Sequence, residues 1–199
     1  MGGAVQVGMG GGSVAALCGG LSAALSSMVA ALTWSKKGME SSRPAMKARG
    51  VRSQALKDRF IDAVDRDTDA FNAVLTARRL PKSTDEEKAA RADAMERANQ
   101  EATRVPLTVL EDSVEALALA LAVAKEGNPA SVSDAGVAGA CALAAAEGAS
   151  LNVRINLPSV TDAEASARFA SQQKELLGRA RDLAERIRAA VDDVLDRTT

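Results

Sequence analysis

The chain has 199 residues, which suits one domain with a sizeable core, and its 25 basic and 26 acidic side chains give no global field that would recruit nucleic acid. Because it has no histidine, Ser-His-Asp catalysis, Cys-His catalysis and histidine-based zinc sites are excluded, and acid–base chemistry would fall to carboxylates, Lys, Cys or bound water. Abundant Ala and few aromatic side chains favour closely packed helices over a β-sandwich.

The N-terminal stretch carries no charged side chain before Lys36, and by length alone it could cross a membrane. It consists mainly of Ala, Gly and Ser, and no basic segment precedes it, so a buried helix of a soluble protein is favoured over a transmembrane helix or a signal peptide. Ser13 is the predicted N-cap of a helix that runs to about Trp34. The amides of Gly11, Gly12 and Ser13 could receive an anion or a carbonyl oxygen, although an ordinary N-cap would look the same.

A second helix is predicted to begin after Ser42, with Pro44 in its first turn, and to reach Arg79. Gly50 is a position at which this helix could bend or break. The following residues, Leu80 to Ser83, end the helical pattern.

Asp67 is the most unusual position within this second helix. On a helical wheel it lies at the centre of an apolar face, within about 60° of seven apolar side chains. These are Leu56, Phe60, Ala63, Val64, Ala70, Phe71 and Val74. An ionised carboxylate on a buried face is costly, so Asp67 should be paired with a basic side chain, protonated or kept for chemistry.

A third helix should open with the capping box Thr84–Glu87 and extend to Lys125, with Pro106 kinking or dividing it. A turn at residues 127–129 follows. Ser133 or Asp134 is then the expected cap of a fourth helix.

The fourth helix is predicted to end near Asn156, and one of its faces consists of small side chains with polar groups at both ends. The members of this face are Asp134, Ala138, Cys141, Ala145, Gly148, Asn152 and Asn156. Such a face can either connect helices through polar contacts or line a pocket. Cys141 and Cys18 are expected to be reduced, small core residues.

A second capping box, Thr161–Glu164, is predicted to open a long C-terminal helix whose apolar spacing suits a bundle face or a subunit contact. No segment has the alternating pattern of a strand. The predicted fold is therefore all-α, a single-domain bundle of long helices that dimerises through helix faces.

Taken together, these segments resemble the cyclodeaminase/cyclohydrolase family. That family includes the cyclodeaminase domain of formiminotransferase-cyclodeaminase and stand-alone methenyltetrahydrofolate cyclohydrolases. The resemblance covers nearly the whole chain, in the family's order. Its parts are Gly10–Ala16, Val64–Asp67 with Ala70–Phe71, Arg79–Lys82, Thr84 with Glu86–Lys88, Val105–Leu107, Gly127–Asn128, Ser133–Asp134 and Asn152–Leu157.

The resemblance implies an all-helical subunit, usually a homodimer, that acts on tetrahydrofolate one-carbon derivatives. The family's catalytic aspartate corresponds to Asp67, and the pocket residues correspond to Ser13, Asn128, Asp134, Asn152 and Asn156. Residues 1–199 are expected to form one cyclodeaminase/cyclohydrolase domain. Since the family usually has Pro in place of Met9 and a further helix before the glycines, this domain is expected to lack an N-terminal helix.

We expect Asp67 to be the general acid/base in the conversion of 5-formiminotetrahydrofolate to 5,10-methenyltetrahydrofolate and ammonia, with its pKa raised by apolar neighbours. The alternative reaction is hydrolysis of 5,10-methenyltetrahydrofolate to 10-formyltetrahydrofolate. A further alternative is a non-catalytic helical assembly module, which would give Asp67 a permanent basic partner and no cavity beside it.

Other expectations concern partners. Lys36, Arg78 or Lys82, or their basic neighbours, would contact the glutamate tail of a folate, including a polyglutamylated one. No metal and no cofactor beyond the tetrahydrofolate substrate is expected. Neither nucleic acid nor a membrane is an expected partner, and the expected location is the cytoplasm.

Overall fold

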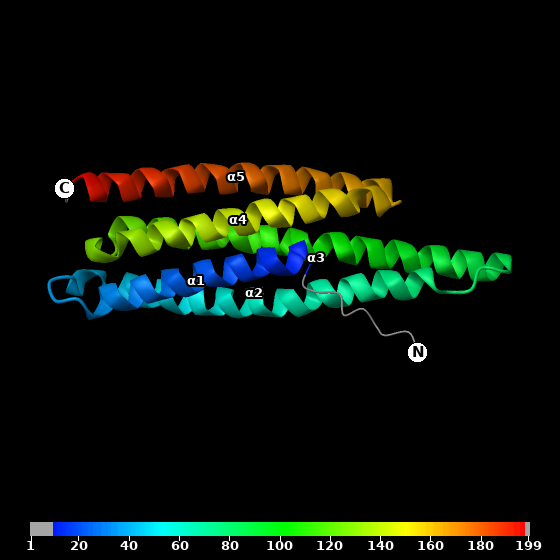
Figure 1. Cartoon of the computed structure of the whole chain (residues 1–199), viewed down its shortest axis with the longest axis horizontal. Helices are drawn as coiled ribbons and strands as arrows, with labels where there is room; N and C mark the ends of the chain where they lie inside the picture. The colour runs from blue at the N-terminus through cyan, green and yellow to red at the C-terminus, as the bar shows by residue number, and fades with distance from the viewer. Residues whose placement is uncertain (1–9, 198–199) are drawn as a thin grey trace.

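The computed structural model describes residues 10–197, and every regular element in that part of the chain is helical (Figure 1). The five long helices are α1 (Gly11–Ser35), α2 (Arg43–Arg78), α3 (Asp85–Glu126), α4 (Val132–Asn156) and α5 (Ala163–Asp196). Short 3₁₀ turns, η1 (Glu40–Ser42), η2 (Pro129–Ser131) and η3 (Leu157–Ser159), lie in three of the connections. The all-α prediction is confirmed. Met9, where the family usually has Pro, lies outside the described residues.

The helices lie side by side along one axis, and successive helices run in opposite directions (Figure 1). Helix α1 packs against α2 and α4, while α5 packs against α3 and α4. The α2–α3 hairpin extends well beyond the beginning of α1 and the end of α4. The side chains at the tip of this hairpin therefore have fewer helices around them than those in the centre of the bundle.

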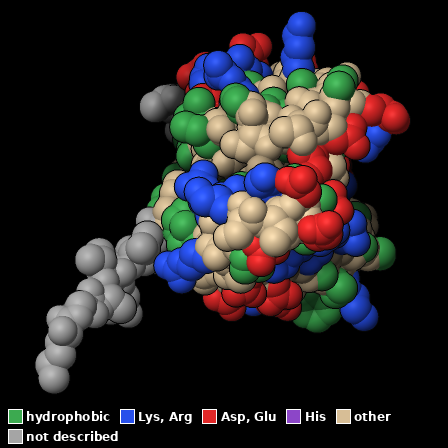
Figure 2. Space-filling model, turned by 90° about the vertical axis from the view of Figure 1, so that its right-hand side faces the viewer, with side chains coloured by type: hydrophobic (Ala, Val, Ile, Leu, Met, Phe, Trp, Pro, Cys, Tyr) green, Lys and Arg blue, Asp and Glu red, His purple; other side chains and the backbone are tan. Residues whose placement is uncertain are grey.

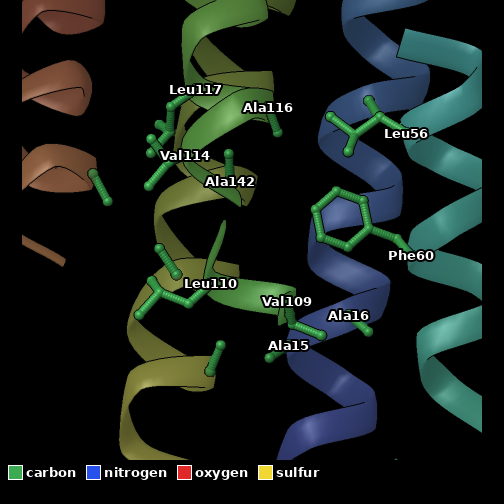
Figure 3. Close-up of a cluster of buried hydrophobic side chains, with 14 of the residues drawn as sticks. Ala15, Ala16, Leu56, Phe60, Val109, Leu110, Val114, Ala116, Leu117 and Ala142 are labelled. Carbon is green, nitrogen blue, oxygen red and sulfur yellow. The ribbon is translucent and has the colours of Figure 1, made fainter. Parts of the chain in front are cut away.

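Phe60 of α2 is the largest fully buried side chain, and it contacts α1 at a glycine. Figure 3 shows Phe60 and Leu56 on the side of α2 that faces α1. A Cβ atom built at Gly19 would lie 2.6 Å from Cδ1 of the Phe60 ring, closer than real Cβ contacts. The ring therefore fits only because residue 19 has no side chain.

The contact between α1 and α4 is also made by small residues. A Cβ atom built at Gly148 would lie 3.0 Å from Cβ of Ala15, and Ala138 and Ala145 are fully buried. This agrees with the small-residue face predicted for α4. Cys141 is a free, partly buried thiol, as is Cys18, and burial raises the pKa of Cys141.

Two predicted helix caps are wrong because the helices begin earlier. Helix α1 begins at Gly11 with Gly10 as its N-cap, so Ser13 lies inside the first turn and its hydroxyl is available for another partner. Helix α4 begins at Val132, directly after η2, and neither Ser133 nor Asp134 is its cap.

The start of α5 is also capped differently from the prediction. Asp162 is the N-cap, and its carboxylate accepts from the amide of Ala165 at 2.9 Å. Thr161 instead donates its hydroxyl and its amide to Glu96 of α3. The Thr161 hydroxyl, with further donors from Gln100 and the backbone, lowers the pKa of Glu96 to about 2. This carboxylate thereby joins the start of α5 to α3.

The capping box at the start of α3 is confirmed, since Thr84 and Glu87 exchange the expected side-chain-to-backbone hydrogen bonds. Pro106 lies inside α3 and does not divide it. Likewise, α2 continues through Gly50 without interruption.

Two helical segments, Gly11–Ser35 and Pro129–Ser159, are long and apolar enough to cross a membrane by length and composition. In the most apolar stretch of each segment, 56% and 44% of the residues, respectively, are buried inside the bundle. A core helix of a soluble protein has these same properties.

Candidate active site at the start of α1

Asp67 of α2 lies directly against the first turn of α1. The Ser13 hydroxyl donates to Oδ2 of Asp67 at 2.8 Å. A Cβ atom built at Gly12 would lie 2.7 Å from Cγ and 2.8 Å from Oδ2 of Asp67, and closer still to Oδ1. Only glycine at position 12 therefore leaves room for this carboxyl group.

Asp67 lies at the N-terminal end of α1 and has no basic partner among the described residues. The N-terminal end of a helix carries partial positive charge from its unpaired amides, and the first turn of α1 has no acidic residue that would compete for it. Among residues 10–197, Asp67 forms no ion pair with a Lys or Arg side chain. The permanent basic partner predicted for a non-catalytic module is thus not present in the described part of the chain.

The predicted burial of Asp67 is only partly correct. Leu56 and Phe60 are fully buried, but Asp67 is half-buried, and Phe71 is 49% exposed. The reason is that α1 begins beside Asp67 and does not extend along α2 to cover the following turn. Asp67 therefore lies at the edge of the buried face and not at its centre.

Asn152 of α4 completes this group of residues. A Cβ atom built at Gly11 would lie 3.3 Å from Nδ2 of Asn152, and the same nitrogen donates to the carbonyl of Gly148 at 2.8 Å. Five predicted site residues thus come together from three helices. They are Gly11, Gly12, Ser13, Asp67 and Asn152.

Asn156, one turn further along α4, has a contact with the neighbouring helix. Its side-chain amide donates to the carbonyl of Ala102 in α3 at 2.6 Å. Asn156 therefore connects α4 to α3 next to the site, with one of its two amide N–H donors used in this contact.

Asn128, Asp134 and Lys36 lie at the opposite end of α1 and α4. The backbone amide of Asn128 donates to Oγ1 of Thr33, near the end of α1, at 2.8 Å. Asp134 precedes Asn152 by 18 residues on the same helix, which corresponds to about 27 Å along its axis. Within a single chain, the predicted pocket residues Asn128 and Asp134 therefore do not lie beside Asp67.

Arg78 and Lys82 lie in a third place, at the tip of the α2–α3 hairpin. Arg78 is eleven residues beyond Asp67 on α2, about 16 Å along the helix axis. Figure 2 looks along the bundle onto this end of the molecule, where Lys and Arg side chains stand beside acidic ones. Both side chains are exposed and could meet only a distant part of a ligand bound at Asp67.

Sequence reasoning overlooked Asp112 of α3, which is only 9% exposed. Arg59 of α2 contacts it at 3.0 Å and also contacts Glu115 at 2.6 Å. Burial nevertheless dominates and raises the pKa of Asp112 to about 6. The signal was present in the sequence, because Asp112 shares helical spacing with the buried residues Val109 and Ala116.

Three grooves among the described residues run along α5, against α3 or α4, and Asp67 lines none of these three. Within residues 10–197, no three Cys, Asp or Glu side chains are grouped as a metal site would require. Asp67 itself is half-buried, at the open edge of the bundle where α1 begins.

Comparison with known proteins matches this chain along most of its length. The sequence profile described as formiminotransferase-cyclodeaminase matches residues 5–175. A methenyltetrahydrofolate cyclohydrolase from Methylorubrum extorquens is 40% identical over 178 residues, which is 89% of this chain and 86% of that protein. A formimidoyltransferase-cyclodeaminase from Sus scrofa is 35% identical over 88% of this chain but only 32% of its own length.

The fold matches a solved structure as well. A formiminotetrahydrofolate cyclodeaminase from Thermotoga maritima superposes with a TM-score of 0.84 at 25% identity, over 94% of this chain and 89% of that one. Sequence and structure agree, and the chain belongs to the formiminotransferase-cyclodeaminase family.

Proposed function

We propose that this chain is a folate one-carbon enzyme in which Asp67 is the general acid/base, with no cofactor beyond the tetrahydrofolate substrate. The observation that carries the proposal is the position of Asp67. Its carboxyl group is oriented by Ser13, lies against the first turn of α1, and has no basic partner among the described residues. A carboxylate held in this way can both accept and return a proton.

Of the two reactions considered from the sequence, hydrolysis of 5,10-methenyltetrahydrofolate is now the first candidate. The relative named as a cyclohydrolase is 40% identical, and 86% of its length is matched. Conversion of 5-formiminotetrahydrofolate, our first expectation from the sequence, is the second candidate. It is favoured by the cyclodeaminase from Thermotoga maritima, whose fold matches over nearly its whole length.

In the hydrolytic reaction, Asp67 would accept a proton from a water molecule while the water oxygen attacks the carbon that bridges N5 and N10. The bond from that carbon to N5 then breaks, N5 receives the proton from Asp67, and the hydroxyl group loses its proton as the carbonyl forms. The product is 10-formyltetrahydrofolate plus one released proton. The hydrogen bond from Ser13 to Oδ2 would fix the orientation of the carboxyl group during both proton transfers.

In the second reaction, N10 attacks the formimino carbon on N5 and loses its proton, and Asp67 protonates the departing nitrogen so that ammonia leaves. One proton is taken up overall, and the cationic 5,10-methenyltetrahydrofolate forms. Both reactions pass through a tetrahedral carbon bonded to N5 and N10. One acid/base at this carbon could therefore serve either of them.

The two reactions are distinguished by one absorbance assay for 5,10-methenyltetrahydrofolate, run with each substrate in turn. Loss of its absorbance, faster than without protein, identifies the hydrolase. Growth of absorbance from 5-formiminotetrahydrofolate, with ammonia released in equal amount, identifies the deaminase. If neither substrate changes, the proposed function is wrong.

We further propose that the enzyme is a homodimer formed through the outer face of α1 and α4. Helix α1 carries no charged side chain, and the two helices expose a row of large apolar residues. Its members are Val14, Leu17, Leu21, Met28 and Leu32 on α1, and Val137, Leu151 and Ile155 on α4. A contiguous apolar face of this length is typical of a protein–protein interface, and a second copy of the chain offers the same face.

This interface would explain why the predicted pocket residues lie at two ends of one chain. The apolar face runs from the Asp67 end to the end that carries Asn128 and Asp134. If the two-fold axis is perpendicular to the helices, the Asp134 end of one copy lies beside the Asp67 end of the other. The dimer would then close the open edge at Asp67.

Leu21→Arg tests this arrangement, because it places a charge in the middle of the apolar face. We expect the variant to be monomeric by light scattering and to lose activity, whereas Ile61→Arg, at an exposed position on α2, should leave both unchanged. Mixing inactive Asp67→Asn and Asp134→Asn chains should restore activity if the two ends meet across the interface. A fully active monomer would rule the arrangement out.

The basic side chains Lys36, Arg78 and Lys82 are proposed contacts for the glutamate tail of the folate. All three are exposed. Arg78 and Lys82 lie beyond Asp67 on the same chain, whereas Lys36 lies at the far end of α1 and could reach this tail only from the second copy of the proposed dimer. Reversal of charge at one of them should weaken binding of a polyglutamylated substrate more than that of the monoglutamate. Equal affinity for both would exclude the residue tested.

A further inference from the structure

Phe71 is a large aromatic side chain placed in solvent next to the proposed acid/base. It is 49% exposed, in contrast to Phe60 on the same helix, which is fully buried. Phe71 follows Asp67 by four residues, so the two side chains share one face of α2, with roughly 6 Å between their Cβ atoms. The chain has only four aromatic residues, and this one adjoins the site.

The exposure of Phe71 follows from the place where α1 begins. Gly11 is the first residue of α1, and the glycine beside Asp67 is Gly12, so α1 does not reach the next turn of α2. The same opening that leaves Asp67 half-buried therefore leaves Phe71 uncovered. A ligand that contacts Asp67 from this open side would also reach Phe71.

The chemistry of the ligand suggests what the ring contributes. In 5,10-methenyltetrahydrofolate, the carbon between N5 and N10 belongs to an amidinium group, which is flat and carries a delocalised positive charge. Aromatic faces attract such cations, and more strongly when water is excluded. On neighbouring turns of one helix, a carboxylate can attract the positive charge of this group while an aromatic ring packs against its flat face.

We propose that Phe71 binds the cationic one-carbon unit of 5,10-methenyltetrahydrofolate through its ring face, beside the carboxylate of Asp67. This inference rests on the proposed function and adds a basis for selectivity. The site prefers the cationic methenyl form over folates that carry a neutral formyl group. The preference is common to both candidate reactions, since the methenyl form is the substrate of one and the product of the other.

The test compares two ligands on two proteins. Dissociation constants are measured for 5,10-methenyltetrahydrofolate, which is cationic, and for 5-formyltetrahydrofolate, which is neutral at the same position. Both are titrated against the Asp67→Asn variant, in which turnover is suppressed, and against the same variant carrying Phe71→Leu. Leucine keeps an apolar side chain of similar reach but has no aromatic face. Ile61→Ala, in the same background, is the control for an exposed apolar residue away from the site.

We expect Phe71→Leu to weaken binding of the methenyl form by about 3- to 30-fold and binding of the formyl form by much less. Equal weakening of both ligands would overturn the inference and give the ring a purely apolar or structural role. So would an unchanged affinity, or a change in the dimer fraction that accounts for the loss. The absorbance assay of the wild-type protein is independent of these titrations. A failure of the proposed function would therefore be seen in the assay, and a failure of this inference in the titrations.

Discussion

Asp67 and Asp112 are carboxylates on neighbouring helices, and they differ in burial and in hydrogen-bonding and ionic partners. Asp112 is almost fully buried, contacts the guanidinium of Arg59 at 3.0 Å, and has its pKa raised to about 6 by burial. Asp67 is half-buried, accepts a hydrogen bond from Ser13, and has no basic partner among the described residues. The more buried acid is thus the one that already forms an ion pair with a basic side chain.

The difference explains why we propose Asp67, and not the more buried Asp112, as the catalytic acid. The sequence argument searched for an acid on an apolar helical face, and Asp112 meets this criterion. However, Asp112 is paired with Arg59 and lies near further acidic side chains. Asp67 is distinguished by access and by orientation. A carboxyl group can exchange protons with a ligand only where the ligand can reach it.

The largest expected effect is on turnover. Asp67→Asn keeps the shape of the side chain and removes the titrating proton, so we expect turnover to fall by about 10²–10⁴ with the fold intact. Asp112→Asn is the matched control and should keep turnover within about threefold. The steady-state assay described above measures both variants. Full activity of Asp67→Asn, or its loss in a folded Asp112→Asn protein, would reverse the roles given to the two acids.

Gly12→Ala should affect the Asp67 site and leave the Asp112 site unchanged, without replacing either carboxylate. Alanine is a good helix former, but its Cβ would occupy the space of the Asp67 carboxyl group and displace it. We expect turnover to fall by about 10² while the unfolding midpoint changes little. The control is Gly20→Ala, where a Cβ would lie 3.7 Å from Phe60, an ordinary contact. Comparable activity in the two variants would show that the position of Asp67 does not matter.

The last expected effect concerns stability and not turnover, and it belongs to Asp112. A carboxyl group whose pKa is raised in the folded state, here from 3.8 to about 6, stabilises most below pH 4 and loses that contribution as the pH rises through 6. Asp112→Asn removes this dependence, and Arg59 keeps Glu115 as its partner. The variant should therefore gain up to about 3 kcal/mol relative to wild type between pH 4 and pH 7.5. Urea unfolding at several pH values measures the difference, and a difference that stays constant with pH would contradict the assignment.

Much of the fold could be predicted from local signals. The capping box at Thr84, the early Pro44 and the end of α4 at Asn156 are determined by residues close together in sequence. The cap at Ser13 was predicted wrongly because helix propensity does not show whether a hydroxyl will bond its own helix or a neighbouring one. Its actual partner, Asp67, is 54 residues away.

The errors at the site have the same origin. A helical wheel for α2 correctly places Phe60, Asp67 and Phe71 on one face, but it contains no information about where α1 begins. Phe71 lies beyond that point and is 49% exposed. Similarly, the helix that carries Asp134 and Asn152 has the predicted face, yet its length separates the two residues by about 27 Å. The separation of Asp134 and Asn152 could have been calculated from the predicted helix alone, whereas the exposure of Phe71 required the assembled bundle.

The close contact between α1 and α4 has a consequence for the tolerance of this protein to substitution. Ala15 meets Gly148 and Gly11 meets Asn152 with no space for an additional methyl group between the helices. Sliding α1 by one turn, about 5.4 Å, would carry Gly12 away from Asp67 and bring larger side chains against it. A bulky residue at position 15 or 148 should therefore displace Gly12 from Asp67 and lower activity, although it does not contact Asp67. A screen for folded but inactive variants should recover substitutions at the contact between α1 and α4.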